Sequence, residues 1–137
     1  MTEPIKPREQ MTAQERLDLG NAYEDQGNLD EAITTWSAIH RDDNPETYAK
    51  AQLNLGITYY TRGKLDEAIT TWSAIHRDDN PEPYAKAQLN LGVAYEDQGN
   101  LDKAKEAYRN AREFFYYEGE RGYRIHECPP EVIKKTA

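Results

Sequence analysis

Cysteine is almost missing from this sequence of 137 residues, which contains only Cys128. A single thiol excludes a framework of internal disulfides and is typical of a reducing compartment, so we expect a cytoplasmic protein. Long hydrophobic runs are missing as well. No segment approaches the roughly 20 apolar residues that cross a bilayer, and the first residues lack the apolar core of a signal peptide. We therefore expect no membrane partner.

Basic residues are scarce relative to acidic ones. The chain has 17 Lys and Arg against 25 Asp and Glu, which gives a formal net charge of −8 and a pI near 4.9. Binding to the phosphates of a nucleic acid needs clustered Lys and Arg, so we expect no nucleic-acid partner. The negative charge leaves open a small acidic inhibitor that neutralises a basic protein.

Recognisable catalytic and metal-binding patterns are also missing. His126 and Cys128 could ligate a metal, but no second pair of ligands accompanies them, and zinc normally needs four. The His-Arg-Asp triplet at residues 40–42 and 76–78 matches a protein-kinase motif but lacks its downstream asparagine. No nucleophile, base and orienting group stand at an interpretable spacing. We expect no enzyme, no cofactor and no metal site.

What the sequence does contain is an internal repeat of 36 residues. Residues 29–64 return as residues 65–100 with only seven differences. The differing pairs are Thr47/Pro83, Ile57/Val93, Thr58/Ala94, Tyr60/Glu96, Thr61/Asp97, Arg62/Gln98 and Lys64/Asn100. A fixed period of this size is typical of a repeat array, in which each unit buries its apolar face against its neighbours.

Helix start and stop signals predict six helices and no strands. Capping residues begin helices at Thr12, Asn28 and Asn44, and glycines end them at Gly27 and Gly63. The expected helices cover about residues 13–26, 29–40, 45–62, 65–77, 81–98 and 100 onward. We expect residues 1–11 to form a flexible leader, residues 12–118 the repeat domain and residues 119–137 a C-terminal cap or tail.

The repeat resembles the tetratricopeptide repeat (TPR). Three motifs in register carry the resemblance: Leu19-Gly20-x-x-Tyr23-x-x-x-Gly27, Leu55-Gly56-x-x-Tyr59-x-x-x-Gly63 and Leu91-Gly92-x-x-Tyr95-x-x-x-Gly99. The resemblance implies an all-α fold, an α-solenoid of three helix-turn-helix repeats with a C-terminal capping segment. The period exceeds the family's usual length of about 34 residues. We expect the additional residues, near 41–46 and 77–82, to extend the helices.

The first glycine of each motif lies inside an expected helix, where glycine costs about 1 kcal/mol against alanine. A helix that keeps such a glycine usually lets a neighbouring side chain approach its backbone closely. We expect the neighbour to be the aromatic residue of the paired helix. The expected pairs are Gly20 with Trp36, Gly56 with Trp72 and Gly92 with Tyr108.

By the resemblance, the first helix of each pair lines a concave groove that binds a partner. The implied groove residues are Gln14, Leu17, Asp18, Asn21, Glu24, Asp25, Lys50, Leu53, Asn54, Ile57, Tyr60, Thr61, Lys86, Leu89, Asn90, Val93, Glu96 and Asp97. Among them we expect partner contacts from Asn21, Lys50, Leu53, Asn54, Ile57, Lys86, Leu89, Asn90 and Val93. The leucines would form an apolar floor for a peptide, or would instead pack between adjacent helices.

Asn21, Asn54 and Lys86 also match part of the carboxylate clamp of co-chaperone TPR domains, which grips the acidic tail of a chaperone. Leu17 and Asn90 stand where that clamp has basic residues, and their lack of charge removes most of the charge-assisted hydrogen bonding. Nearby acidic residues would repel a carboxylate. The clamp is therefore the less favoured interpretation.

The sequence thus predicts a non-catalytic protein–protein interaction module, a scaffold that binds a peptide or helix of another protein. A self-assembling structural repeat protein is an alternative. The aromatic patch at residues 114–117 is open to two interpretations. We expect residues 119–137 to cover the last helix, with a homodimer through this patch as the alternative.

Overall fold

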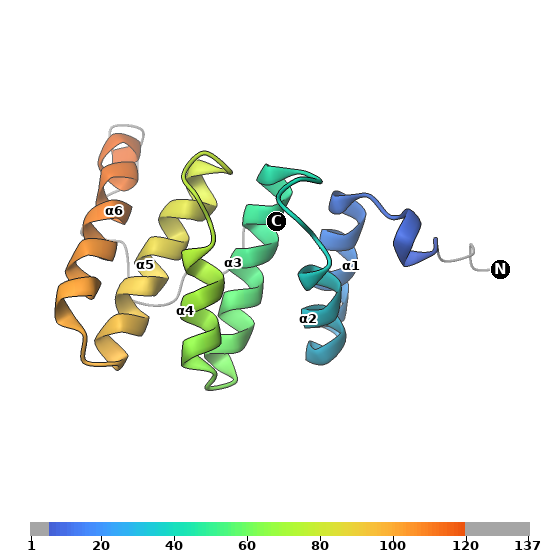
Figure 1. Ribbon diagram of the computed structural model, residues 1–137, viewed down its shortest axis with the longest axis horizontal. Helices are drawn as coiled ribbons and strands as arrows, with labels where there is room; N and C mark the ends of the chain where they lie inside the picture. The colour runs from blue at the N-terminus through green and yellow to red at the C-terminus, as the bar shows by residue number, and fades with distance from the viewer. Residues whose placement is uncertain (1–5, 120–137) are drawn as a thin grey trace.

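The computed structural model describes the backbone of residues 6–119 and the side chains of residues 6–114, and it contains six α-helices in that range (Figure 1). They are α1 (Ala13–Asp25), α2 (Leu29–Ser37), α3 (Pro45–Thr61), α4 (Leu65–Ser73), α5 (Pro81–Asp97) and α6 (Leu101–Gly119), preceded by a short 3-10 helix, η1 (Arg8–Gln10). Successive helices pack as three hairpins that stand side by side in a row. No strand occurs within residues 6–119. The predicted all-α solenoid is confirmed.

The caps at the start of the first helices follow the predicted chemistry. Thr12 Oγ1 accepts a hydrogen bond from the Glu15 N–H at 3.1 Å, and the Glu15 carboxylate accepts one from the Thr12 N–H at 3.1 Å. Asn44 Oδ1 accepts from the Thr47 N–H at 3.1 Å. The copy at Asn80 cannot cap α5 in this way, because Pro83 replaces Thr47 and has no N–H.

The turn inside each hairpin is made by a glycine in the left-handed conformation. Gly27, Gly63 and Gly99 have φ of 80°, 77° and 80°, as the sequence predicts. The predicted side-chain cap at Asn28 is wrong. Its Nδ2 donates to Gln26 Oε1 at 3.3 Å instead of its side chain capping α2.

The connections between hairpins correct two further expectations. α4 ends at Ser73 rather than near residue 77, and residues 41–43 and 77–79 form turns instead of additional helix. In each turn an aspartate carboxylate accepts a backbone N–H three residues earlier: Asp43 from His40 at 3.2 Å and Asp79 from His76 at 2.9 Å. Such local bonds offer the backbone an alternative to helical hydrogen bonding, so the helix stops.

An aromatic ring on the second helix of each hairpin packs directly on a glycine of the first. A Cβ atom at Gly56 would lie 2.2 Å from Trp72 Nε1, and one at Gly20 would lie 2.2 Å from Trp36 Nε1. Gly92 meets Tyr108 in the same way in the third hairpin. Both tryptophans are fully buried. The predicted glycine–aromatic pairs are confirmed.

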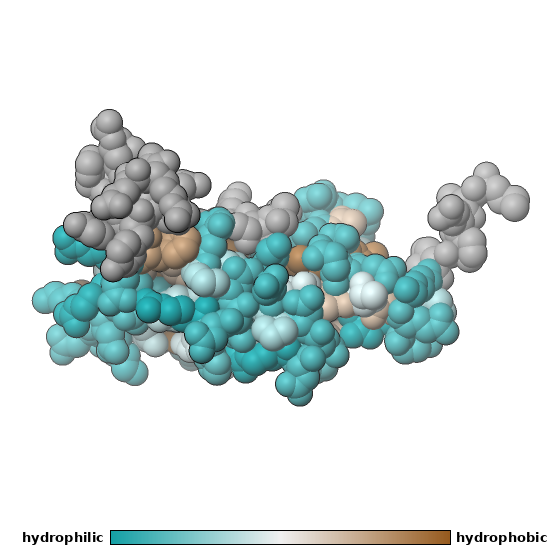
Figure 2. All heavy atoms as spheres, turned by 90° about the horizontal axis from the view of Figure 1, so that it is seen from above, coloured by the Kyte–Doolittle hydropathy of each residue, from teal (hydrophilic) through white to brown (hydrophobic). Residues whose placement is uncertain are grey.

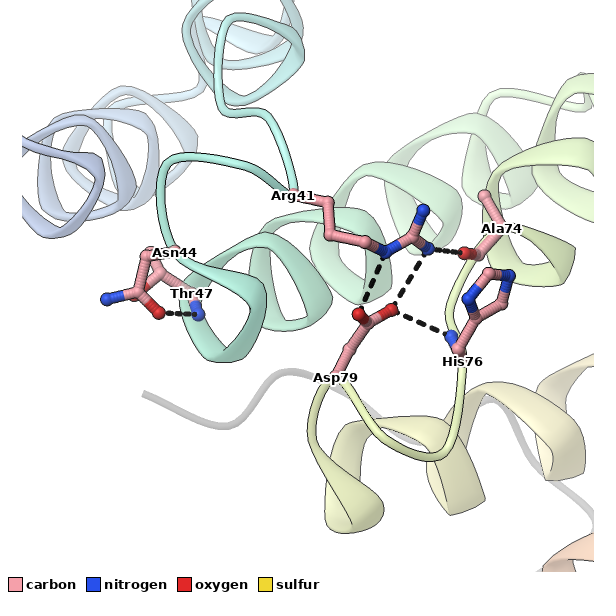
Figure 3. Close-up of polar contacts among 6 residues, drawn as sticks. All are labelled: Arg41, Asn44, Thr47, Ala74, His76 and Asp79. Carbon is pink, nitrogen blue, oxygen red and sulfur yellow. Dashed lines mark hydrogen bonds and ion pairs between the residues drawn. The ribbon is translucent and has the colours of Figure 1, made fainter.

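An ion pair joins the turn of one repeat to the turn of the next (Figure 3). Arg41 donates from Nε to Asp79 Oδ1 at 2.8 Å and from Nη2 to Asp79 Oδ2 at 3.0 Å. The same guanidinium donates to the Ala74 carbonyl, which caps the end of α4. We call these contacts the inter-repeat clasp. Burial alone would raise the pKa of Asp79, but the hydrogen bonds from Arg41 and the His76 N–H outweigh it and hold the pKa below its usual range.

The two near-identical units do not share this clasp. Asp43 is the counterpart of Asp79, but it is exposed and contacts no arginine among the residues that the structure describes. Arg77 is the counterpart of Arg41 and pairs with Glu113 at 2.6 Å, with both side chains largely in solvent. The same turn sequence therefore has a different environment in each repeat.

Part of the expected leader contacts the first hairpin. Lys6 Nζ lies 2.9 Å from Glu15 Oε1, and Arg16 Nη2 donates to the Arg8 carbonyl of η1 at 2.8 Å. The domain boundaries themselves stay predictions. Residues 1–5 and 120–137, which include nearly all of the expected cap, lie outside the described residues.

Replacing Gly56 with alanine should lower the free energy of unfolding. Helix propensity alone predicts a gain of about 1 kcal/mol, whereas overpacking against the buried Trp72 ring costs about 1–3 kcal/mol. Urea unfolding followed by circular dichroism should show a lower midpoint for Gly56→Ala. The control is Glu67→Ala on the exposed side of α4. We expect its free energy of unfolding to lie within about 0.5 kcal/mol of the parent value. A midpoint above that of the parent would show that the Trp72 ring yields without loss, because only the gain in helix propensity would then remain.

The inter-repeat clasp can be tested with a matched pair of variants, Asp79→Asn and Asp43→Asn. At neutral pH the first should lower the free energy of unfolding by about 1–2 kcal/mol, a value discounted because Arg41 is 36% exposed. The second should change it by less than about 0.5 kcal/mol. Equal effects of the two variants would contradict a stabilising clasp.

The contribution of the clasp should also depend on pH. Because the folded-state pKa of Asp79 lies below the unfolded value of about 3.9, the stabilisation is complete above that value and is lost as pH falls toward the folded pKa. The difference in unfolding free energy between the parent and Asp79→Asn should therefore shrink between about pH 7 and about pH 3. A difference that persists undiminished at the acidic end would argue against an ionic origin.

Candidate functional site

The first helices of the three hairpins form one face of the array. α1 packs against α3 and α3 against α5, whereas α2, α4 and α6 make no comparable contact with one another within residues 6–119. A row of hairpins that is closer-packed on one side curves toward that side. We call the surface of α1, α3 and α5 the inner face.

The leucines expected to floor the groove belong to the core. Leu17 and Leu53 are 0% exposed and Leu89 is 7% exposed. Each packs among buried residues of neighbouring helices. The structure therefore supports the alternative, in which these leucines pack between helices. Leu53 and Leu89 present almost no surface to a partner.

The polar residues expected in the groove are engaged inside the protein. Asn54 is 1% exposed, and its Nδ2 donates to Asn21 Oδ1 at 3.0 Å, which joins α1 to α3. Asn90 is fully buried. Lys86 is half-buried and pairs with Glu82 of its own helix at 2.9 Å. Groups that a carboxylate clamp would need are thus already in use.

A pocket of about 370 Å³ opens between α1 and α3. It is lined by Glu24, Asp25, Leu29, Asn54, Ile57, Thr58 and Thr61, and we call it the α1–α3 pocket. Of the predicted partner contacts, Asn54 and Ile57 line it; Lys50, Lys86 and Val93 do not. Leu29 and Thr58 were missed by the sequence reasoning. The signal for Thr58 was available, because Thr58/Ala94 is one of the seven differences between the repeats.

One repeat further on, Tyr60 spans the corresponding gap between α3 and α5. Its hydroxyl donates to Asp97 Oδ2 at 2.6 Å, and its ring centroid lies 5.9 Å from that of Trp72. The hydrogen bond to Asp97, together with burial, raises the pKa of Tyr60 to about 12. The hydroxyl therefore stays protonated and remains a donor at neutral pH.

A metal site was expected to be absent, and the described residues cover only part of the chain. There, no group of three or more His, Cys, Asp or Glu side chains is placed to hold a metal ion. Arg41 of the kinase-like triplet is held in the inter-repeat clasp. His126 and Cys128 lie outside the described residues.

The aromatic patch near the C-terminus is described only in part. The Phe114 side chain is half-buried and packs beside Leu89 and Ala111, and the patch beyond it lies outside the described side chains. The predicted homodimer through this patch stays a prediction. Within the described residues, no helix is long and apolar enough to cross a membrane.

Comparison with known families gives two matches to the tetratricopeptide repeat, over residues 17–75 and 53–115. Comparison with individual curated proteins gives no match. The matched segments together cover more than half of the chain and include the three glycine–aromatic pairs. Domains of this family generally mediate protein–protein interactions and are typically non-catalytic. The chain belongs to the tetratricopeptide repeat family.

Proposed function

We propose that this protein is a non-catalytic interaction module that binds a peptide or helix of a partner protein along its inner face. The observation that carries the proposal is the α1–α3 pocket. Its volume of about 370 Å³ is within the range of ligand pockets, and it combines apolar walls with a few polar groups. As a scaffold, the module would act in the cytoplasm, since a single cysteine is typical of a reducing compartment.

Recognition would use the pocket as an anchor for one side chain, with the rest of the segment lying along α3 and α5. Lys50 and Val93 are half-buried on these helices and keep part of their surface available. By contrast, the side of the array seen from above in Figure 2 is mostly hydrophilic where described residues are visible. Scattered apolar residues on such a surface do not mark a docking site.

A pocket-filling variant tests the proposal. Peptides selected on the intact chain from a random peptide library should bind at least about tenfold more weakly to Thr61→Trp, because the indole would occupy the α1–α3 pocket. Isothermal titration calorimetry measures both affinities, after circular dichroism has shown that the variant is folded.

Thr70→Trp is the matched control. Thr61 and Thr70 are both exposed helical threonines whose hydroxyls donate to a backbone carbonyl of the same helix, but Thr70 lies on α4. Binding to Thr70→Trp should equal binding to the parent. Selected peptides that bind Thr61→Trp as well as the parent would rule out the pocket as the anchor.

A further inference from the structure

One surface of the first hairpin corresponds to the surface that covers the preceding hairpin elsewhere in the row. In the second hairpin Ala51 and Leu55 pack on the first, and in the third hairpin Ala87 and Leu91 pack on the second. All four are buried. The corresponding surface of α1 is defined by Glu15, Leu19 and Tyr23, and we call it the end face.

A short segment of the chain lies on the end face in place of a hairpin. It consists of residues 6–10, and we call it the strap. Figure 1 places its 3-10 helix, η1, beside α1 on the side away from α3. Lys6 Nζ pairs with Glu15 Oε1 at 2.9 Å, and Arg8 Nη2 donates to the Tyr23 hydroxyl at 3.4 Å. The strap therefore contacts α1 near both of its ends.

Arg16 both holds the strap and caps α2. Its Nη2 donates to the Arg8 carbonyl of the strap at 2.8 Å, and its Nη1 donates to the Ala38 carbonyl at the end of α2 at 3.2 Å. In the second hairpin the matching carbonyl, that of Ala74, accepts from Arg41 of the preceding turn. Arg16 thus gives the first hairpin, from within, the cap that the second receives from its neighbour.

Positions 15 and 16 suit the strap and not another hairpin. The second and third hairpins have Ala-Gln at the matching positions, residues 51–52 and 87–88. The alanines leave room for the preceding hairpin and are fully buried against it. Glu15 and Arg16 place two charged side chains there instead. Burying these charges under the apolar surface of a hairpin would be costly, because such a surface offers them no partner.

The opposite end of the row keeps an apolar side chain in solvent. Leu101 begins α6 and is 60% exposed. Its counterparts Leu29 and Leu65 are half-buried, and Leu29 lines the α1–α3 pocket beside Ile57 of the next hairpin. Leu101 therefore marks a surface that a following hairpin covers elsewhere in the row. Because the repeats are near-identical, this surface of one copy suits the end face of another copy, and such a head-to-tail contact continues without closing.

We propose that the strap closes the N-terminal end of the array against a second copy of the chain. Head-to-tail contact needs both ends of the molecule, so covering one end is enough to prevent it. Terminal units of repeat arrays need a polar outer surface to stay soluble, and the strap with Glu15 and Arg16 provides one. This role concerns self-association and is independent of peptide binding at the inner face.

A charge-neutral double variant tests the proposal on the full chain. Glu15→Ala/Arg16→Gln gives the first hairpin the Ala-Gln pair of the other two, and it removes one acidic and one basic side chain, so the net charge stays at −8. Trypsin should then cleave after Arg8 at least about tenfold faster than in the parent, because the strap is no longer held. Analytical ultracentrifugation should show a mass that rises with concentration above the 15.8 kDa of the monomer.

Lys103→Gln/Glu106→Ala is the matched control. It removes the same kinds of charge from two exposed residues of α6, which line a pocket beside Ser73 of α4 and so lie on the side of α6 that faces α4. This variant should behave like the parent, a monomer that is cleaved slowly after Arg8. Adding Leu101→Glu to Glu15→Ala/Arg16→Gln should restore the monomer, because a carboxylate would replace the apolar side chain at the contact.

Several results would overturn the proposal. Faster cleavage after Arg8 in a double variant that stays monomeric at every concentration would show that the strap does not prevent stacking. Unchanged cleavage, self-association of the parent, and self-association that survives Leu101→Glu would each contradict it as well. If circular dichroism shows that the double variant is unfolded, Arg16→Gln alone keeps the capping box of Thr12 and Glu15 and carries the same two expectations.

Discussion

The contact on which the array depends is the approach of an aromatic ring to a helix backbone that lacks a Cβ atom. In each hairpin the ring occupies the space that a side chain would otherwise fill, so the two helices approach closely. Trp36 and Trp72 are thereby fully buried, and each hairpin keeps a further apolar surface for the next one. The row of hairpins follows, because no hairpin can bury that surface alone.

Near-identical sequences do not give identical environments in such a row. The inter-repeat clasp forms where Arg41 meets Asp79, but the residue 36 positions before Arg41 is Ile5, which cannot form an ion pair with Asp43. The position of a turn in the array therefore decides whether its aspartate meets an arginine and forms a part-buried ion pair. Local sequence, by contrast, decides between Asn44 and Asn80. Only Asn44 caps its helix, because the residue three positions later is Thr47 after Asn44 but Pro83, which has no N–H, after Asn80.

The inner face shows how small substitutions change a surface within a repeat. Tyr60 spans the gap between α3 and α5, while the corresponding position in α1 is Glu24, and a pocket opens between α1 and α3. An aromatic ring fills volume and donates a hydrogen bond, whereas a carboxylate leaves the volume open and adds charge. The differences at Ile57/Val93, Thr58/Ala94 and Thr61/Asp97 fall on the lining of this pocket or on its counterpart in the next repeat.

The sequence by itself determined the six helices, the glycine turns and the glycine–aromatic pairs, because capping, left-handed turns and helical periodicity are local properties. Only the tertiary structure decided that α4 stops at Ser73, that Leu53 and Leu89 are core residues, and that a pocket lies between α1 and α3. Periodicity places a residue on a helix face, but the exposure of its side chain depends on how closely the adjacent helix packs against that face. The separation of the two helices is set by contacts between residues of different repeats, which are far apart in the sequence.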